Sequence, residues 1–94
     1  MSLFAVHYSY DDRAEDREAA RPEHRAYFEA LAREGKAVAF GRFEDHLSPG
    51  ALIILDVDTR EEAEAIVAAD PFVRAGLVPG AFVRTWPAGG PWAR

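Results

Sequence analysis

Two residues of this chain, His24 and Asp70, have side chains suited to proton transfer. His24 lies in the helix-like segment 21–36, on the same apolar stripe as Phe28 and Leu31. Asp70 ends a second helix-like run and stands directly before a proline. A carboxylate beside an imidazole orients the ring and stabilises its charged form. If the fold brings the two side chains together, they have the composition of a general acid/base centre.

Each of these residues also has a purely structural interpretation. Asp-Pro is a typical helix start, so Asp70 could cap a short turn over 70–76 that Gly76 ends. A single histidine on an apolar helix face is more often a packed, hydrogen-bonded core residue than a catalyst. Both interpretations stay open from the spacing alone, since Asp70 could cap a helix and hold His24 at the same time.

A few further side chains are candidates for contact with a substrate. Arg42 and Arg74 could hold a carboxylate or a phenolate, although Arg74 is better explained as a solvated surface arginine. Tyr8 and Phe72 suit the core or a dimer interface, and they could also line a pocket beside the histidine. We predict substrate contacts for Arg42, Phe72 and Tyr8.

Metal and cofactor chemistry has no recognisable motif in this sequence. The chain has no cysteine, and its three histidines do not have metal-ligand spacing. The glycines lack the strand-loop-helix context of a phosphate-binding loop, and the serines lack that of a nucleophile elbow. We therefore expect neither a metal nor a cofactor.

The composition limits the classes of partner. A net charge of −5 over 94 residues leaves no basic stripe, so nucleic acid and anionic membranes are poor partners. We expect no leader, because the first residues lack a basic-then-apolar pattern, and no membrane helix, because no apolar run is long enough. Absence of cysteine fits a reducing compartment. We expect one cytoplasmic domain over 1–94, ending in a Pro/Gly-rich tail at 87–94, which binds a small-molecule substrate.

Hydrophobic periodicity predicts six elements in the order β-α-β-β-α-β. Pro22 suits the first position of a helix and Gly35 its C-terminal cap, while Thr59 and Glu62 form a capping box that opens a second helix. Gly41, inside a strand, could mark a bulge or a close approach of the backbone. The polar segment 11–20 is expected to be a loop or a frayed helical turn, and the predicted strands are 3–10, 38–44, 51–57 and 81–86.

This order indicates an α+β fold of the ferredoxin-like type, in which two helices cover one face of a four-stranded antiparallel sheet. Strands that are apolar on both sides, in a chain too small for a second layer, imply that the other face meets a second copy. We therefore expect a homodimer. Antiparallel helices would also bring the start of the first helix, with His24, beside the end of the second, with Asp70.

The segments RPEHRAYFEALAREGKAVAFGRF and GALIILDVDTREEAEAIVAADPF, with a late V-x-x-W strand, resemble the YciI-like (YCII-related) family of small bacterial proteins. The resemblance runs from Leu3 to about Trp86, and R-P-x-H and D-P-F are its most specific parts. It implies a ferredoxin-like fold, a dimeric α+β barrel and a catalytic pair at His24 and Asp70. One departure is Arg42, which follows the glycine of the second strand where the family often has proline.

These features predict a small cofactor-independent enzyme with lyase, isomerase or dehydrohalogenase-like activity. His24 would move a proton and Asp70 would orient it, on a small molecule that could be aromatic or oxygenated. One alternative is a non-catalytic ligand-binding or regulatory dimer in which the pair is structural. The other is a cofactor-free oxygenase, which the dimeric α+β barrel architecture can host.

Overall fold

The computed structural model of the chain describes residues 2–91, which form four strands and three helices. The Pro/Gly-rich tail predicted for 87–94 lies partly outside the described residues. The elements are β1 (Ser2–Ser9), α1 (Ala14–Arg33), β2 (Ala37–Arg42), β3 (Gly50–Val57), α2 (Arg60–Ala68), α3 (Pro71–Arg74) and β4 (Gly80–Thr85).

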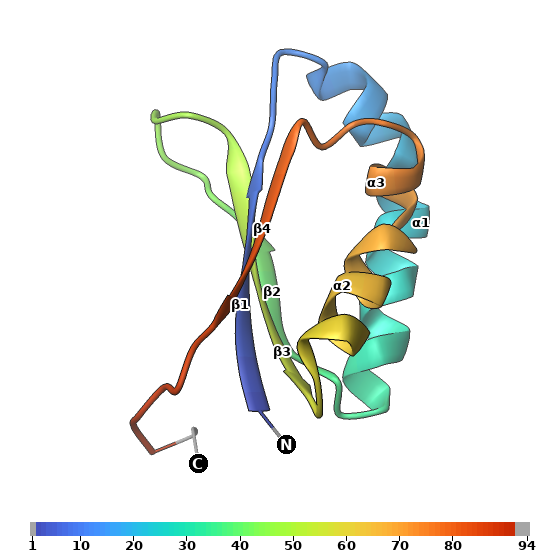
Figure 1. Cartoon of the computed structure of the whole chain (residues 1–94). Helices are drawn as coiled ribbons and strands as arrows, with labels where there is room; N and C mark the ends of the chain where they lie inside the picture. Colours follow the sequence, from blue (N-terminus) through green and yellow to red (C-terminus); the bar gives the residue numbers. More distant parts are fainter. Residues whose placement is uncertain (1, 92–94) are drawn as a thin grey trace.

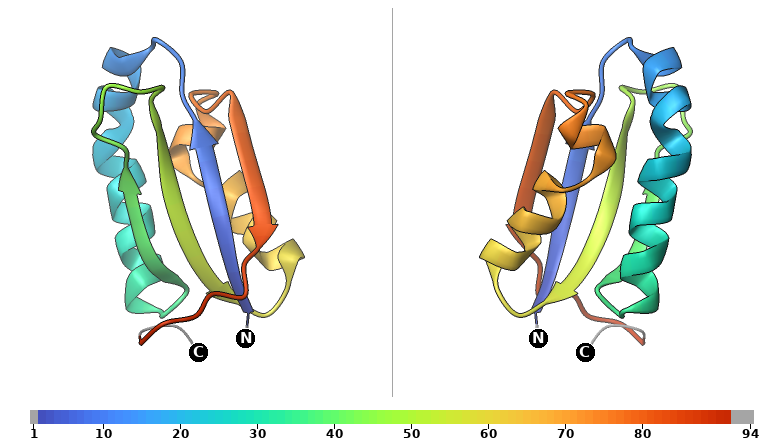
Figure 2. Two further views of the ribbon diagram at one scale, coloured as in Figure 1. Left: turned by 90° about the vertical axis from the view of Figure 1, so that its left-hand side faces the viewer. Right: turned by 90° about the vertical axis from the view of Figure 1, so that its right-hand side faces the viewer.

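The strands form one antiparallel sheet in the order β2-β3-β1-β4. All three helices lie on one face of this sheet, as Figure 1 and the two views of Figure 2 show. The predicted ferredoxin-like fold is confirmed, with the apolar run of β3 in the interior of the sheet. The opposite face carries no helix and is called the open face below.

The core lies between the sheet and the helices. Alternate residues of β1, namely Phe4, Val6 and Tyr8, point toward the helices and are buried. Burial of a large apolar side chain contributes about 1.5–3 kcal/mol, so these contacts hold the helices on the sheet. Their buried partners include Phe28, Leu31, Ile53, Leu55, Ile66 and Val67.

The first helix starts eight residues earlier than Pro22 suggests, so residues 14–20 of the segment predicted as a loop or a frayed helical turn belong to a regular helix. Helix α1 begins at Ala14 and contains Pro22, whose missing N–H removes one backbone hydrogen bond. The extra turns are held by Arg17, which is only 3% exposed. Its guanidinium donates to the side chain of Asp11 at 2.9 Å and to the carbonyl of Leu77. These tertiary contacts outweigh the start signal of the proline.

The glycine of β2 has neither of its expected roles. Gly41 pairs regularly with Leu52, and the irregularity of the strand lies between Ala37 and Ala39. A Cβ atom added at Gly41 would meet no atom within 4 Å. The bulge is therefore elsewhere in the strand, and no close approach requires the glycine.

The other two predicted helix boundaries, the start of α2 and the end of α1, agree with the structure. The Thr59 hydroxyl accepts a hydrogen bond from the Glu62 backbone N–H at 3.1 Å and caps α2. Gly35 follows α1 with a φ of 78°, which favours glycine, and the Lys36 N–H donates to the Leu31 carbonyl at 2.9 Å. These local signals were sufficient because each acts within a few residues.

Candidate active site

Asp70 lies between α2 and α3 and caps the shorter helix. Its Oδ1 atom accepts a hydrogen bond from the Phe72 backbone N–H at 3.0 Å, and Pro71 occupies the first helical position. The Asp70 side chain is fully buried. Because burial of a carboxylate is costly unless the charge is compensated, a cap alone does not account for this position.

Two further donors reach Asp70 from other elements. His24, in the middle of α1, approaches Oδ1 with its Nδ1 atom at 2.8 Å. Tyr8, on β1, donates its hydroxyl to Oδ2 at 2.7 Å. Both carboxylate oxygens thus have hydrogen-bond partners. Asp70 caps α3 and contacts His24 at the same time. The aspartate joins the end of α2, the sheet and α1 at one point.

The His24 ring is fixed in orientation. A carboxylate only accepts hydrogen bonds, so Nδ1 is the donor in this pair and Nε2 is the nitrogen left for other partners. The ring stacks on Phe72, with a centroid distance of 3.9 Å and an interplanar angle of 7°, and meets the Phe28 ring edge-on at 5.1 Å. The side chain keeps 14% of its surface exposed. An imidazole so held is preorganised, yet solvent or a ligand can reach it.

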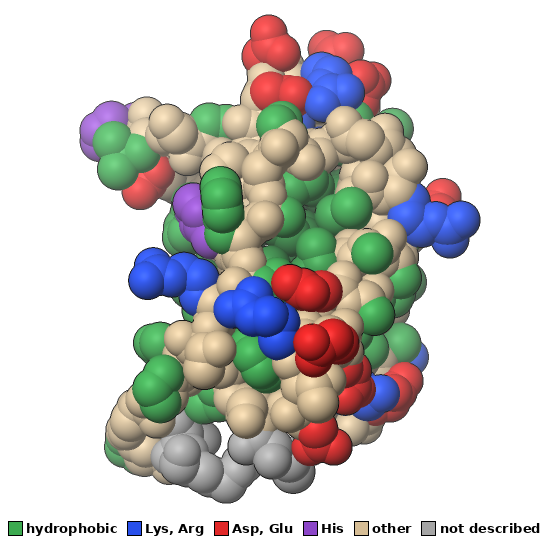
Figure 3. All heavy atoms as spheres, viewed as in Figure 1, with side chains coloured by type: hydrophobic (Ala, Val, Ile, Leu, Met, Phe, Trp, Pro, Cys, Tyr) green, Lys and Arg blue, Asp and Glu red, His purple; other side chains and the backbone are tan. Residues whose placement is uncertain are grey.

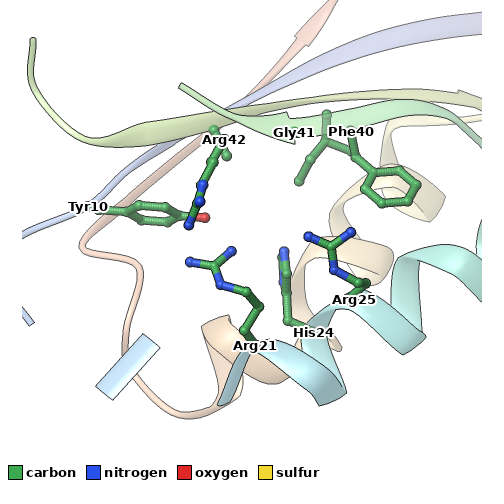
Figure 4. A pocket seen from close by; sticks show the side chains of 9 residues that line it. Tyr10, Arg21, His24, Arg25, Phe40, Gly41 and Arg42 are labelled. Carbon is green, nitrogen blue, oxygen red and sulfur yellow. The ribbon is translucent and has the colours of Figure 1, made fainter. Parts of the chain in front are cut away.

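A small hollow of about 70 Å³, open to solvent on one side, adjoins His24 between α1 and strands β2 and β3 (Figure 4). We call it the His24 pocket. It is lined by Tyr10, Arg21, His24, Arg25, Phe40, Gly41, Arg42, Ala51 and Ile53.

Two tyrosines near the pair stay protonated at neutral pH. Burial, reinforced by the negative charge of Asp70, raises the pKa of Tyr8 far above its usual value. Burial and Asp70 also raise the pKa of Tyr10 to about 12, although Arg21 and Arg17 act in the other direction. Tyr8 therefore keeps its proton and donates a hydrogen bond to Asp70, and Tyr10 can donate a hydrogen bond to a ligand in the pocket.

The family model of the YCII-related domain matches residues 1–87. The chain belongs to the YCII-related family. Among solved structures it is similar to 5-chloro-2-hydroxyhydroquinone dehydrochlorinase from Burkholderia phenoliruptrix AC1100, in complex with 2,5-dihydroxybenzoquinone. The TM-score is 0.78 and the identity 25%, over 93% of this chain and 95% of that chain.

A second similar structure is an antibiotic biosynthesis monooxygenase, with a TM-score of 0.59 and 18% identity over 96% of this chain and 100% of that chain. This likeness concerns the fold alone. The comparison with curated proteins found no match.

The structure places the predicted site residues of this YCII-related chain in two layers. His24 and Arg42 line the pocket, while Asp70 lies behind the histidine. The expectation that Tyr8 and Phe72 line the pocket is corrected, because both are fully buried and lie outside its lining. Tyr8 instead holds Asp70, and Phe72 supports the His24 ring.

Four polar or aromatic pocket residues were missed from the sequence, namely Tyr10, Arg21, Arg25 and Phe40. Arg21 lies three residues before His24, which places both on one side of a helix. Taking Pro22 as the first helical residue left Arg21 outside the helix and hid this signal. Phe40 and Arg42 alternate on β2 and so share the face toward α1.

Proposed function

We propose that this chain is a small cofactor-independent enzyme that transfers protons, with His24 as the acid/base and Asp70 as its orienting partner. The observation that carries the proposal is the 2.8 Å contact between His24 Nδ1 and the buried Asp70 carboxylate, at the edge of an open pocket. The proposed reaction class is lyase-type elimination on a small oxygenated ring.

The geometry supports this role for a chemical reason. Nδ1 is bound to Asp70, so a neutral His24 has its lone pair on Nε2, which can take a proton from a ligand. The imidazolium that forms stays beside the Asp70 charge, which stabilises it. Phe72 and Phe28 keep the ring from rotating away. General acid/base catalysis of this kind contributes about 10²- to 10⁴-fold in rate.

The reaction class is supported by the similar dehydrochlorinase, whose fold matches this chain over 93% of its length. In an elimination of HCl, the substrate reacts as its keto tautomer, in which a proton has moved from a ring hydroxyl to the chlorine-bearing carbon, and a base removes the proton of another ring hydroxyl. The electron pair of the broken bond to hydrogen moves into the ring system, and chloride leaves with the pair of the C–Cl bond. One proton and one chloride leave in total, so no oxidant or reductant is consumed. One histidine with a fixed partner has the groups that this step needs.

The experiment that tests the proposal is chloride release from 5-chloro-2-hydroxyhydroquinone, followed with a chloride electrode. We expect the protein to raise the rate well above that in buffer. A protein that binds this probe, by calorimetry, but leaves the rate at the buffer value would contradict the elimination. It would favour the non-catalytic ligand-binding alternative. The oxygenase alternative rests on a likeness of fold at 18% identity and has no observation in its favour.

We also propose that the open face joins two copies of the chain. Strand pairing places Leu52, His7 and Phe82 in one row across β3, β1 and β4. Leu52, on the interior strand β3, is 39% exposed, and Phe82, on the edge strand β4, is 58% exposed; apolar side chains exposed together on one face of a sheet are typical of an interaction surface. At the left margin of Figure 3, where the open face is seen edge-on, hydrophobic side chains lie beside basic ones and histidines.

A homodimer is therefore expected by sedimentation equilibrium at micromolar concentration, with at least about 1,200 Å² of buried surface. Phe82→Asp should weaken the dimer by about 10-fold or more, since it would bury a charge in an apolar interface. Ala65→Asp, at an exposed position of α2, is the matched control and should leave the dimer unchanged. A wild-type monomer would contradict the role of the open face.

Among residues 2–91, no helix combines the length and the apolarity that a membrane crossing requires. The cytoplasmic location, the single-domain organisation over 1–94 and the lack of a nucleic-acid partner stay predictions from the sequence.

A further inference from the structure

We propose that the His24 pocket selects small planar oxyanions, either carboxylates or ring enolates, through Arg21, Arg25 and Arg42. This inference names the substrate class of the site and rests on the proposed function. It starts from a contrast of charge. The chain as a whole has a net charge of −5, yet the pocket lining contains three arginines and no carboxylate.

The three guanidinium groups converge on the space above the histidine. Figure 4 shows Arg21 and Arg25 on either side of the His24 ring, both from α1, with Arg42 reaching toward them from β2. A guanidinium presents several N–H donors in one plane and pairs with the two oxygens of a planar anion. Three such groups around one hollow favour an anionic ligand over a neutral one.

Arg21 is positioned before a ligand arrives. Its Nε donates to both carboxylate oxygens of Glu18, at 2.9 and 3.1 Å, and its guanidinium lies 5.9 Å from the centre of the Phe72 ring. The hydrogen bonds to Glu18 do not use the two terminal nitrogens of Arg21. These nitrogens can therefore bind a ligand without loss of the contacts that hold the side chain.

Arg42 can exchange its partners more freely. It contacts Glu44 at 3.1 Å and Glu18 at 3.6 Å, and about half of its side chain is exposed. Exposed ion pairs of this kind contribute little, so a ligand in the less exposed pocket can replace them. Arg25 has no ion-pair partner among residues 2–91, so its charge is available for a ligand.

The remaining walls fit a flat molecule. Tyr10 and Phe40 add aromatic surface, and the protonated Tyr10 hydroxyl can donate to an oxyanion. The arrangement also links binding to chemistry. When His24 takes a proton from a hydroxylated or carbonyl-bearing ring, negative charge develops on oxygen, and nearby guanidinium groups stabilise that charge.

The test is calorimetric binding of matched anionic and neutral probes. The ring enolate is 2,5-dihydroxybenzoquinone, whose hydroxyls are ionised near neutral pH, with 2,5-dimethoxybenzoquinone as its neutral counterpart. The carboxylate is benzoate, with benzamide as its counterpart. We expect at least one anion to bind about 10-fold or more tightly than its counterpart, with an affinity that falls as NaCl is raised. Binding of benzoate would identify the ligand class as carboxylates, and binding of 2,5-dihydroxybenzoquinone would identify it as ring enolates.

Arginine variants identify the groups responsible. Arg42→Gln and Arg25→Gln should each weaken binding of that anion by about 10-fold and leave the neutral probe unchanged. Arg33→Gln, at the exposed end of α1, is the matched control and should change neither.

Equal affinity for anion and neutral counterpart, binding of neither anion, or unchanged affinity in both pocket variants would overturn this inference. His24→Gln should keep the affinity for the anion, so its effect on turnover tests the proposed function separately.

Discussion

Replacement of His24 by glutamine is expected to lower the rate of chloride release by about 10²- to 10⁴-fold. Glutamine has hydrogen-bonding groups and a similar length, but it cannot take up a proton near neutral pH. Its amide can still donate to Asp70, so the buried carboxylate keeps a partner at the position that Nδ1 occupies. The loss should therefore be seen in kcat, with the affinity for the ligand retained.

The matched control for this variant is His46→Gln, which makes the same change at an exposed histidine of the β2–β3 loop. It should turn over at the wild-type rate. If His24→Gln and His46→Gln both kept the wild-type rate, the proton would be transferred by another group and the assignment of His24 would be wrong.

Asp70→Asn is expected to lower turnover by a similar factor, about 10²- to 10⁴-fold, through a different cause. Asparagine is a good helix cap and can keep the contact with the Phe72 N–H, so α3 should form. The imidazolium of His24 would lose the charge that stabilises it. The amide would also place its NH₂ group against the Tyr8 hydroxyl, which in the wild type donates a hydrogen bond to the carboxylate.

A buried donor without an acceptor costs about 1–3 kcal/mol, and chemical denaturation of Asp70→Asn should show a loss of that order. Asp12→Asn, at an exposed position after β1, serves as the control for the change of charge. It should alter neither stability nor turnover. Wild-type turnover in Asp70→Asn would mean that the negative charge of Asp70 has no part in the reaction and that its contacts are structural.

The sequence predicts the elements of this fold wherever the signal is local. Alternation marked the strands, and Thr59 and Gly35 marked helix ends through contacts a few residues away. The start of α1 depends on Arg17, whose partners Asp11 and Leu77 are 6 and 60 residues away. No local sequence pattern indicates the contact between Arg17 and Leu77. The proline at position 22 therefore predicted the wrong start for α1.

The site was predictable to a similar degree. The βαββαβ order puts the helices on one face of the sheet, and His24 does contact Asp70, although it lies in the middle of α1 and not at the helix start that the prediction assumed. The depth at which each side chain lies below the pocket was not predictable. Tyr8 and Tyr10 have the same parity on one strand, but Tyr8 is buried under Asp70, whereas Tyr10 lies just beyond the strand end and lines the pocket. Periodicity predicts which face of a strand a residue occupies, but it does not predict how far that residue lies from the pocket.

The most direct test of the His24–Asp70 assignment is the protonation pattern of the His24 ring. Nitrogen-15 chemical shifts of the neutral imidazole distinguish a protonated nitrogen from one with a free lone pair, and His24→Gln assigns the signals. Because Asp70 accepts from Nδ1, we expect a protonated Nδ1 and a bare Nε2 toward the pocket. A protonated Nε2 with a bare Nδ1 would contradict the assignment, since Asp70 would receive no hydrogen bond from the histidine and Nε2 could not act as the base.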